Sequence, residues 1–368
     1  METVITAKLS LNVSAEELKL LEAVSCAYRD ACNHVSSIAF YEKEYNAVNL
    51  QKKSYAVLRD RFALKAQMAI SVTRTVAARY TKETRIKLDK PVFFSLPQCD
   101  QVRGRDWSID IEKGIVSLNT LEKRIRVPFS SKGFEKYINK DAVYGGAKLV
   151  LRKGKAFLHV SVTLGSPDFI VDETKVVGID RGIINTAVTY DGKRTRFYKG
   201  TEVKQKRAKF KAVRQSLQKR NTPSSRRRLK AIGRRENRYV SDVNHKLAKT
   251  LVAENERGTV FVLEDLYGVR NATCSVKRED RYVSVSWPYY DLQQKLEYKA
   301  SLAGCSVIYV DARHTSQTCP HCLNVDKKAR DRRERLYSCP VCGYKGNDDR
   351  IAAMNIYRRG LERIRQTG

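Results

Sequence analysis

The spacing of apolar positions changes near residue 14. Residues 2–13 alternate apolar and polar side chains, which predicts a β-strand. Ser14 is followed three residues later by Glu17, the signature of a helical capping box, and helical spacing continues behind it. We therefore expect a small helical bundle over residues 14–84. Its later helices are expected at 55–62 and 63–80.

From residue 91 the spacing of apolar positions changes from helical to strand-like. Six short strands separated by turn residues are expected before residue 165. Short strands with basic residues on the polar face suit a small barrel that follows a nucleic-acid backbone, although an ordinary β-domain with solvated lysines fits the pattern equally well. We expect residues 1–13 and 85–166 to form one β-barrel into which the helical bundle is inserted. The strands are expected at 92–95, 107–111, 114–118, 124–128, 147–152 and 155–163.

A second domain is expected after the Gly-Ser-Pro-Asp boundary at residues 165–168. It starts with a three-stranded meander whose first strand ends in Asp180. A long basic stretch over 199–250, broken near Pro223, predicts two helices. The remaining expected elements are a buried strand at 259–266 that contains Glu264, a polar loop at 270–286, a helix at 288–303, a buried strand at 305–310 and a last helix at 349–365.

The net charge helps to choose between a nucleic-acid-binding barrel and an ordinary β-domain. The 368 residues contain 71 Lys and Arg against 40 Asp and Glu, a formal net charge of +31. Such an excess repels itself unless a polyanion neutralises it, which favours nucleic-acid binding. The sequence has neither an apolar run long enough to span a membrane nor a signal segment, so we expect a cytoplasmic, nucleoid-associated prokaryotic protein without a membrane partner.

Four of the nine cysteines form two Cys-x-x-Cys pairs, Cys319 with Cys322 and Cys339 with Cys342. This spacing is typical of a zinc ribbon, and four thiolates leave no position for water, so the zinc is expected to be structural. The alternative is four buried thiols. The other cysteines are scattered, as in a reduced cytosolic protein.

Three acids stand at the ends of predicted elements: Asp180 and Glu264 at strand ends and Asp349 at the start of the last helix. Carboxylates crowded together repel one another, so such a group implies a bound cation. Mg²⁺ prefers oxygen ligands, and two ions about 4 Å apart can activate water and stabilise a leaving oxygen. We expect a ribonuclease H-like α/β domain over residues 167–314 and 344–368.

The motifs around these residues resemble those of TnpB, the RNA-guided nuclease family encoded by insertion sequences and the presumed ancestor of type V CRISPR effectors. Gly-Ile-Asp180-Arg-Gly and Val-Leu-Glu264-Asp-Leu resemble its first two RuvC motifs. Asn-Asp-Asp349-x-x-Ala-Ala resembles the third, and the paired cysteines resemble its target-nucleic-acid-binding insert, here 315–343. Leu323 stands where many relatives have glycine. The family register selects Asp349 over its neighbour Asp348, which looks like the better helix cap.

The resemblance implies an RNA-guided DNA endonuclease. A guide RNA from the transposon end would bind the basic surfaces, and double-stranded DNA would be recognised beside a short motif and hydrolysed at a Mg²⁺-dependent site. Asp180, Glu264 and Asp349 would be both catalytic residues and Mg²⁺ ligands. The candidates for nucleic-acid contacts are Lys65, Gln67, Ser71 and Arg74 on the third helix and Lys206, Arg207, Arg214, Arg226, Arg227 and Arg228 in the basic stretch.

Three other functions remain open. A nuclease-inactive, RNA-guided DNA-binding repressor would share the fold but lose the acids, which are all present here. A guide-independent transposase of the acid-triad class usually ends in a glutamate and has no zinc ribbon before it. A plain zinc-ribbon nucleic-acid-binding protein would leave Asp180 and Glu264 unexplained.

Overall fold

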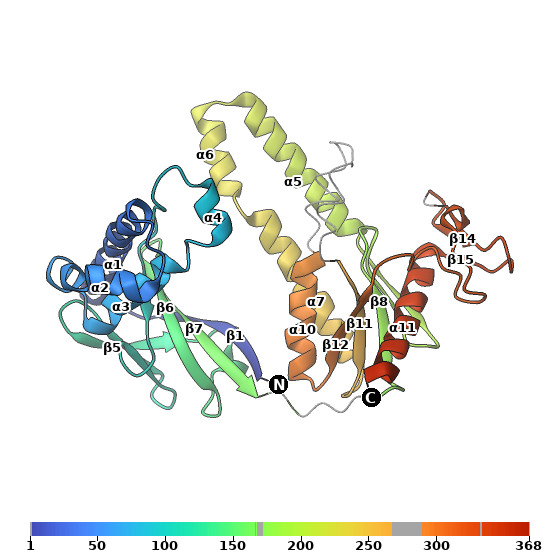
Figure 1. The fold of residues 1–368 in the computed structure, drawn as a ribbon, viewed down its shortest axis with the longest axis horizontal. Coiled ribbons are helices and arrows are strands. Elements are labelled where there is room, and N and C mark those ends of the chain that lie inside the picture. The colour runs from blue at the N-terminus through green and yellow to red at the C-terminus, as the bar shows by residue number, and fades with distance from the viewer. Residues whose placement is uncertain (1, 166, 168–171, 267–288, 332, 368) are drawn as a thin grey trace. The chain divides into compact units, whose positions relative to one another are not determined.

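The chain folds into two compact units, Glu2–Gly165 and Ser166–Gly368. Each has its own hydrophobic core, and each is described by itself (Figure 1). The structure is a computed structural model. It describes residues 2–165, 167, 172–266, 289–331 and 333–367.

The N-terminal unit is built on a seven-stranded antiparallel sheet that curls into a nearly closed barrel, in the order β2-β6-β7-β1-β5-β4-β3. In β1, Ala7, Leu9 and Leu11 are buried while the residues between them face outward, so the period-two pattern is confirmed. The strands are β1 (Glu2–Leu11), β2 (Gln98–Gln101), β3 (Trp107–Asp110), β4 (Ile115–Asn119), β5 (Arg124–Ser130), β6 (Val143–Arg152) and β7 (Lys155–Gly165).

The helices between β1 and β2 share one core with the barrel. The capping box is present, because Ser14 Oγ accepts from Glu17 N at 3.2 Å and Glu17 Oε2 accepts from Ser14 N at 2.8 Å. The second helix starts well before residue 55, because the Asn46 side chain caps it by accepting from Val48 N. The helices are α1 (Ala15–Tyr41), α2 (Ala47–Asp60), α3 (Ala66–Ala77) and the short α4 (Lys82–Lys87).

The predicted strand at 92–95 is wrong. Side chains of α1, not a neighbouring strand, satisfy the backbone there: Asn33 donates to Phe94 O at 3.1 Å and accepts from Phe94 N at 2.8 Å. Ser36 Oγ donates to Val92 O at 2.7 Å. A segment whose backbone groups are bonded by side chains needs no strand partner, and the ladder begins at β2 instead.

The C-terminal unit contains a five-stranded mixed sheet in the order β10-β9-β8-β11-β12. The predicted meander is confirmed, since β8 pairs antiparallel with β9 and β9 with β10. β11 is parallel to both β8 and β12. The bounds are β8 (Val176–Asp180), β9 (Asn185–Tyr190), β10 (Thr195–Lys199), β11 (Val260–Asp265) and β12 (Ser306–Asp311).

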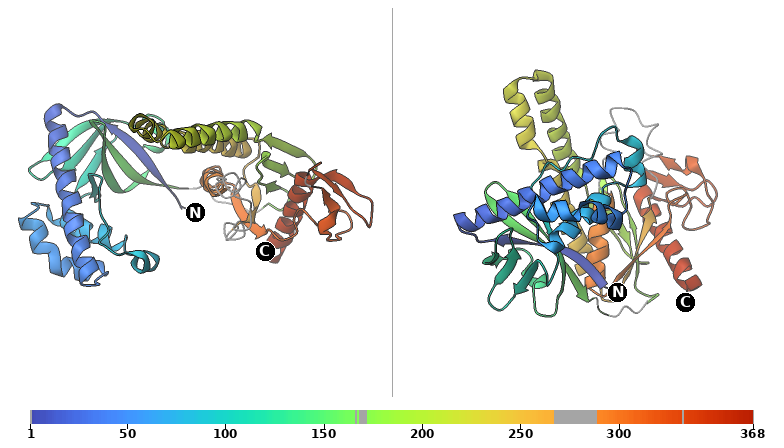
Figure 2. Two further views of the ribbon diagram at one scale, coloured as in Figure 1. Left: turned by 90° about the horizontal axis from the view of Figure 1, so that it is seen from above. Right: turned by 60° about the vertical axis from the view of Figure 1, so that its left-hand side comes forward.

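The basic stretch forms three helices where two were predicted, because Gly233, with φ of 42°, ends the second one early. Figure 2 shows α5 and α6 side by side as a helical hairpin. The predicted loop at 270–286 lies outside the described residues. In the described part of the chain, no helix has the length and apolarity to cross a membrane. The helices are α5 (Thr201–Arg220), α6 (Pro223–Ile232), α7 (Arg235–Ala253), α10 (Tyr289–Leu302) and α11 (Asp348–Thr367).

Helices cover both faces of this sheet (Figure 1). One face packs Val177, Ile179, Phe261 and Leu263 against α7 and α10. The other face packs against α11, which approaches β8 at Gly178. A Cβ atom at Gly178 would lie 2.4 Å from Ala353 O and 2.5 Å from Tyr357 N, so the helix backbone rests directly on the strand.

A small three-stranded antiparallel sheet stands at the N-terminal end of α11 (Figure 1). Its strands are β13 (Arg330–Asp331), β14 (Leu336–Ser338) and β15 (Lys345–Asn347). β15 ends at Asn347 and α11 begins at Asp348, so the small sheet runs into the helix without a linker.

Gly178→Ala should force α11 away from β8, because backbone atoms cannot move aside as a side chain can. We expect this change to lower the stability of the C-terminal unit by about 1–3 kcal/mol or more, measured as a shift in its urea midpoint. Gly346→Ala in the same unit is the matched control, since a Cβ there would first meet the Ile351 side chain at an ordinary 3.4 Å. Equal midpoints for the two variants would contradict the backbone contact.

Candidate active site and metal centre

Strand alternation brings two of the three predicted acids to one face of the sheet. Val177 and Ile179 face α7 and α10, so Asp180 points to the α11 side. In β11, Val262 packs on the α11 side, and Glu264, two residues later, shares that side. Because β8 and β11 are parallel and pair Ile179 with Leu263, the two acids come next in the same register. They meet at the carboxyl edge of the sheet.

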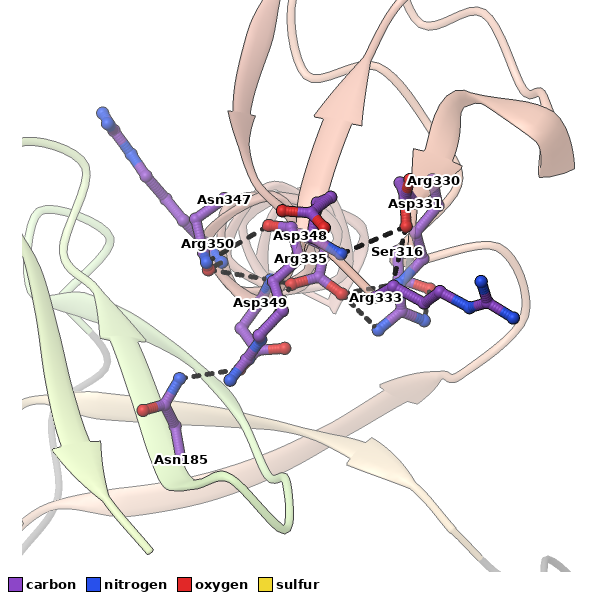
Figure 3. A network of polar contacts seen from close by, with 11 residues as sticks. Asn185, Ser316, Arg330, Asp331, Arg333, Arg335, Asn347, Asp348, Asp349 and Arg350 are labelled. Atoms are coloured by element: carbon purple, nitrogen blue, oxygen red, sulfur yellow. Dashed lines mark hydrogen bonds and ion pairs between the residues drawn. The ribbon is translucent and has the colours of Figure 1, made fainter. Parts of the chain in front are cut away.

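The third acid reaches this edge from the first turn of α11. Asp349 is 8% exposed, and its Oδ2 accepts from Asn185 Nδ2 at 2.8 Å and from the Arg335 guanidinium (Figure 3). Asn185 begins β9, beside β8, so the meander holds Asp349 above the strand that carries Asp180. The structure thus brings Asp180, Glu264 and Asp349 together at one end of the sheet.

The electrostatics reflect this crowding. Desolvation raises the pKa of Asp180 well above its usual value, and the charges of Glu264 and Asp349 raise it further. Desolvation also raises the pKa of Glu264, against the opposing effect of its hydrogen bond from Thr315. Oxygen donors held close together at a cost in free energy are a suitable set for a hard divalent cation such as Mg²⁺.

Several residues that orient these acids escaped sequence reasoning. Thr315 Oγ1 donates to Glu264, and Arg181 donates to the Glu264 carbonyl oxygen at 2.6 Å. Asn355 on α11 donates to the Thr315 carbonyl oxygen at 2.8 Å, which ties that segment to the helix. The sequence does not show which group a polar residue will bond in the folded protein. The only sequence feature that could have indicated these three residues is that they lie close to the motifs.

Asp348 has a different role from its neighbour. It is 2% exposed and forms an ion pair with Arg330 at 2.7 Å, in the small sheet. The expectation that it caps α11 needs correction, because Asn347 Oδ1 accepts from both Asp349 N and Arg350 N, at 3.1 and 3.2 Å. Asp348 Oδ1 accepts only from Asp349 N, at 2.9 Å. Asp348 therefore fastens the small sheet to the helix (Figure 3).

The four paired cysteines converge beside the small sheet, next to Tyr337 of β14. Their sulfur atoms all lie within 4.8 Å of one another, and two of the pairs, Cys319–Cys342 and Cys322–Cys339, are 3.5 Å apart. A tetrahedral Zn²⁺ with bonds of about 2.3 Å requires sulfurs at about this separation. Four thiols without a disulfide therefore form a cluster that can hold a metal ion. Among the described residues, no other group of His, Cys, Asp and Glu meets this closely.

The two Cys-x-x-Cys turns have the same backbone geometry. Cys319 N donates to Asn324 O and Cys339 N donates to Tyr344 O, at 2.8 and 2.9 Å. Leu323 and Gly343 occupy equivalent positions, each donating back to the first cysteine of its turn, with φ of 64° and 72°. Positive φ costs a residue with a side chain about 1–2 kcal/mol, so Leu323 strains the first turn where glycine relaxes the second.

The predicted nucleic-acid contacts divide by exposure. Arg74, Lys206, Arg226, Arg227 and Arg228 are exposed, and Lys65, Gln67 and Arg214 are half-buried. Two predicted contacts need correction. Ser71 is 5% exposed and donates to Gln67 O within α3. Arg207 is 4% exposed and pairs with buried Glu236 at 2.9 Å, so it joins α5 to α7.

Comparison with known proteins supports the motif assignments. Residues 159–273 match a family model described as a probable transposase, and residues 289–356 match the TNB domain of Cas12f1-like proteins. Over 130 residues the chain is 32% identical to a TnpB-like protein of Methanocaldococcus jannaschii, covering 35% of this chain and 45% of that protein. Over these stretches the chain is similar to transposase-type TnpB-like proteins and to Cas12f1-like proteins.

Other similar proteins are Cas12f nucleases. The chain is 29% identical over 228 residues to the CRISPR-associated endodeoxyribonuclease Cas12f1 of Sulfoacidibacillus thermotolerans, covering 58% of this chain and 52% of that protein. The chain thus spans about half the length of the Cas12f1 relatives it matches. A Cas12f1 structure solved with single-guide RNA and target DNA has the same fold, with a TM-score of 0.61, 14% identity and coverage of 97% and 98% of the two chains. The predicted fold class is confirmed.

Asp180→Asn should stabilise this chain in metal-free buffer at neutral pH. A carboxyl group whose pKa is raised in the folded state destabilises that state when ionised, and the penalty disappears as the pH falls through the raised pKa. Each ~1 kcal/mol relieved corresponds to about 2–4 °C in the melting midpoint. The gain should vanish at acid pH. An equal gain from Asp265→Asn, which removes an exposed acid next to Glu264, would contradict the crowding.

Leu323→Gly should stabilise the small sheet by up to about 1 kcal/mol, since glycine adopts positive φ without strain but loses more chain entropy on folding. The expected measurement is slower loss of Zn²⁺ from the loaded protein to a chelator. Leu323→Ala keeps the strain and serves as the control. A loss rate for Leu323→Ala as slow as that for Leu323→Gly would show that the exposed leucine side chain, not the backbone, limits stability.

Proposed function

We propose that this chain is an RNA-guided DNA endonuclease of an insertion sequence. The observation that carries the proposal is that Asp180, Glu264 and Asp349 lie together at one edge of the sheet. The small sheet beside the four cysteines runs directly into α11, the helix that bears Asp349. Names among the relatives support the activity, since the matched Cas12f1 is an endodeoxyribonuclease. The Cas12f1 of similar fold was solved with a guide RNA and its DNA target, which supports the same partners here.

Asp180, Glu264 and Asp349 would hold two Mg²⁺ ions. When bound, these ions supply an activated water and stabilise the leaving oxygen of a phosphodiester. Asn185 keeps one oxygen of Asp349 in position, and the Thr315 hydroxyl does the same for Glu264. Arg335 donates to Asp349, so its guanidinium lies where it can also meet a phosphate oxygen. The protein's part is thus to hold ligands and orient the backbone of the cut strand.

Domain roles follow from the same assignment. Residues 1–13 and 85–166 form the wedge-like barrel with its helical recognition insert at 14–84, and 167–314 with 344–368 form the nuclease domain. The insert at 315–343 would carry structural Zn²⁺ on Cys319, Cys322, Cys339 and Cys342. The formal charge of +31 would be neutralised by guide RNA and by double-stranded target DNA.

Replacing Asp180, Glu264 or Asp349 by alanine should abolish Mg²⁺-dependent cleavage while leaving RNA binding close to normal, because carboxylates hold metal and repel phosphate. Cleavage of target DNA is measured with the full chain and the RNA that co-purifies with it. Asp265→Ala is the matched control and should cut normally. Substantial cutting by any of the three variants would show that the acids are misassigned, and wild-type protein that binds target but never cuts would indicate a repressor.

A further inference from the structure

The hairpin of α5 and α6 contains a cavity that the proposed cleavage site does not use. It has a volume of about 490 Å³ and lies between the two helices. Its floor is apolar and is formed by Phe210 and Val213 of α5 and Ile232 of α6. Val213 is 42% exposed, so part of this floor faces solvent. An apolar floor that is partly open to water offers a surface on which the flat face of a ligand can pack.

The rim of the cavity has one sign of charge. Lys209, Arg228 and Arg235 line it, and all three are exposed. Lys206 also lines the cavity and pairs with Glu202, while Arg207 and Arg214, which do not line it, pair with Glu236. Among the residues that the structure describes, no acidic side chain lines the cavity. The occupant must therefore combine negative charge outside with a flat or apolar group inside.

We infer that this cavity binds an unpaired nucleobase of a single-stranded RNA, with the base stacked on Phe210 and the flanking phosphates on Lys209, Arg228 and Arg235. A base and its phosphates supply this combination of aromatic face and anion, which is how single strands are generally held. A second copy of the chain is a poor occupant, because its own excess of cations would be repelled. The inference deepens the proposed function, since it rests on RNA being the partner of this surface.

The size of the effect follows from the stacking. Loss of one aromatic platform costs about 1–3 kcal/mol per base, or about 5- to 150-fold in affinity. Loss of one phosphate contact should instead weaken all polyanions alike and make the salt slope shallower by about 0.7. Stacking and charge can therefore be separated at this site.

The test uses the full chain and a short oligouridine with one central 2-aminopurine, whose fluorescence is quenched by stacking. We expect Phe210→Ala to weaken binding about 5- to 150-fold and to lose the quenching, while Phe210→Trp retains both. Phe197→Ala removes a 44% exposed phenylalanine from β10 of the same unit and is the matched control. Arg228→Ala should reduce affinity for the oligonucleotide and for inorganic polyphosphate equally.

Two results would overturn the inference. One is unchanged affinity and quenching in Phe210→Ala. The other is loss of binding of that variant to vesicles of anionic phospholipid with no change towards the oligonucleotide, which would assign the cavity to a lipid surface. The measurement contains no DNA, Mg²⁺ or cleavage step. If the proposed nuclease activity fails, the result of this binding test is unaffected. If a variant that no longer binds the base still cuts DNA, base binding fails as an inference while the nuclease activity stands.

Discussion

The close approach of α11 to β8 sets the geometry on which the rest of the C-terminal unit depends. Only a residue without a side chain fits at Gly178, because atoms of the helix backbone occupy the place of a Cβ. A second glycine, Gly360 in α11 itself, lies against the Val262 side chain of β11, whose Cγ2 would be 2.4 Å from a Cβ atom there. These two close contacts along the middle of α11 limit how far the helix can shift, which sets the height of its first turn above the strand ends.

That fixed height forces negative charges together, and neighbouring groups limit the cost. Asn185 and Arg335 bond Asp349, and Arg330 bonds Asp348, so cations from the small sheet offset part of the repulsion. Asp180 has the least compensation and shows the strongest rise in pKa, caused first by burial and then by the other two acids. Residual repulsion of this kind is the usual condition of a site that gains its stability on binding a cation.

Much of this arrangement could be predicted from the sequence because it depends on local patterns. Short apolar runs predicted the strands that carry Asp180 and Glu264, and cysteine spacing predicted the metal cluster. Failures occurred where tertiary bonds replaced local ones. Asn33 and Ser36 satisfy the backbone of residues 92 and 94, which therefore form no strand.

The burial of individual polar side chains also could not be predicted from the sequence. Arg207 looked like one of many surface cations in α5 until its pairing with Glu236 of α7 placed it inside. Ser71 lay on the polar side of α3 by spacing alone, yet its hydroxyl turns back to Gln67 O. Which cations and hydroxyls of a basic helix meet solvent depends on neighbouring helices, and a single sequence does not specify those neighbours.

The direct passage from β15 into α11 gives the thiol cluster a mechanical role. No residue separates Asn347 from Asp348, so the small sheet and α11 are joined without a hinge. The Arg330–Asp348 ion pair holds the two elements together at this junction. A junction without a hinge passes a rotation of the small sheet to the helix. A change in the packing of the small sheet therefore acts on the first turn of α11, where Asp349 stands.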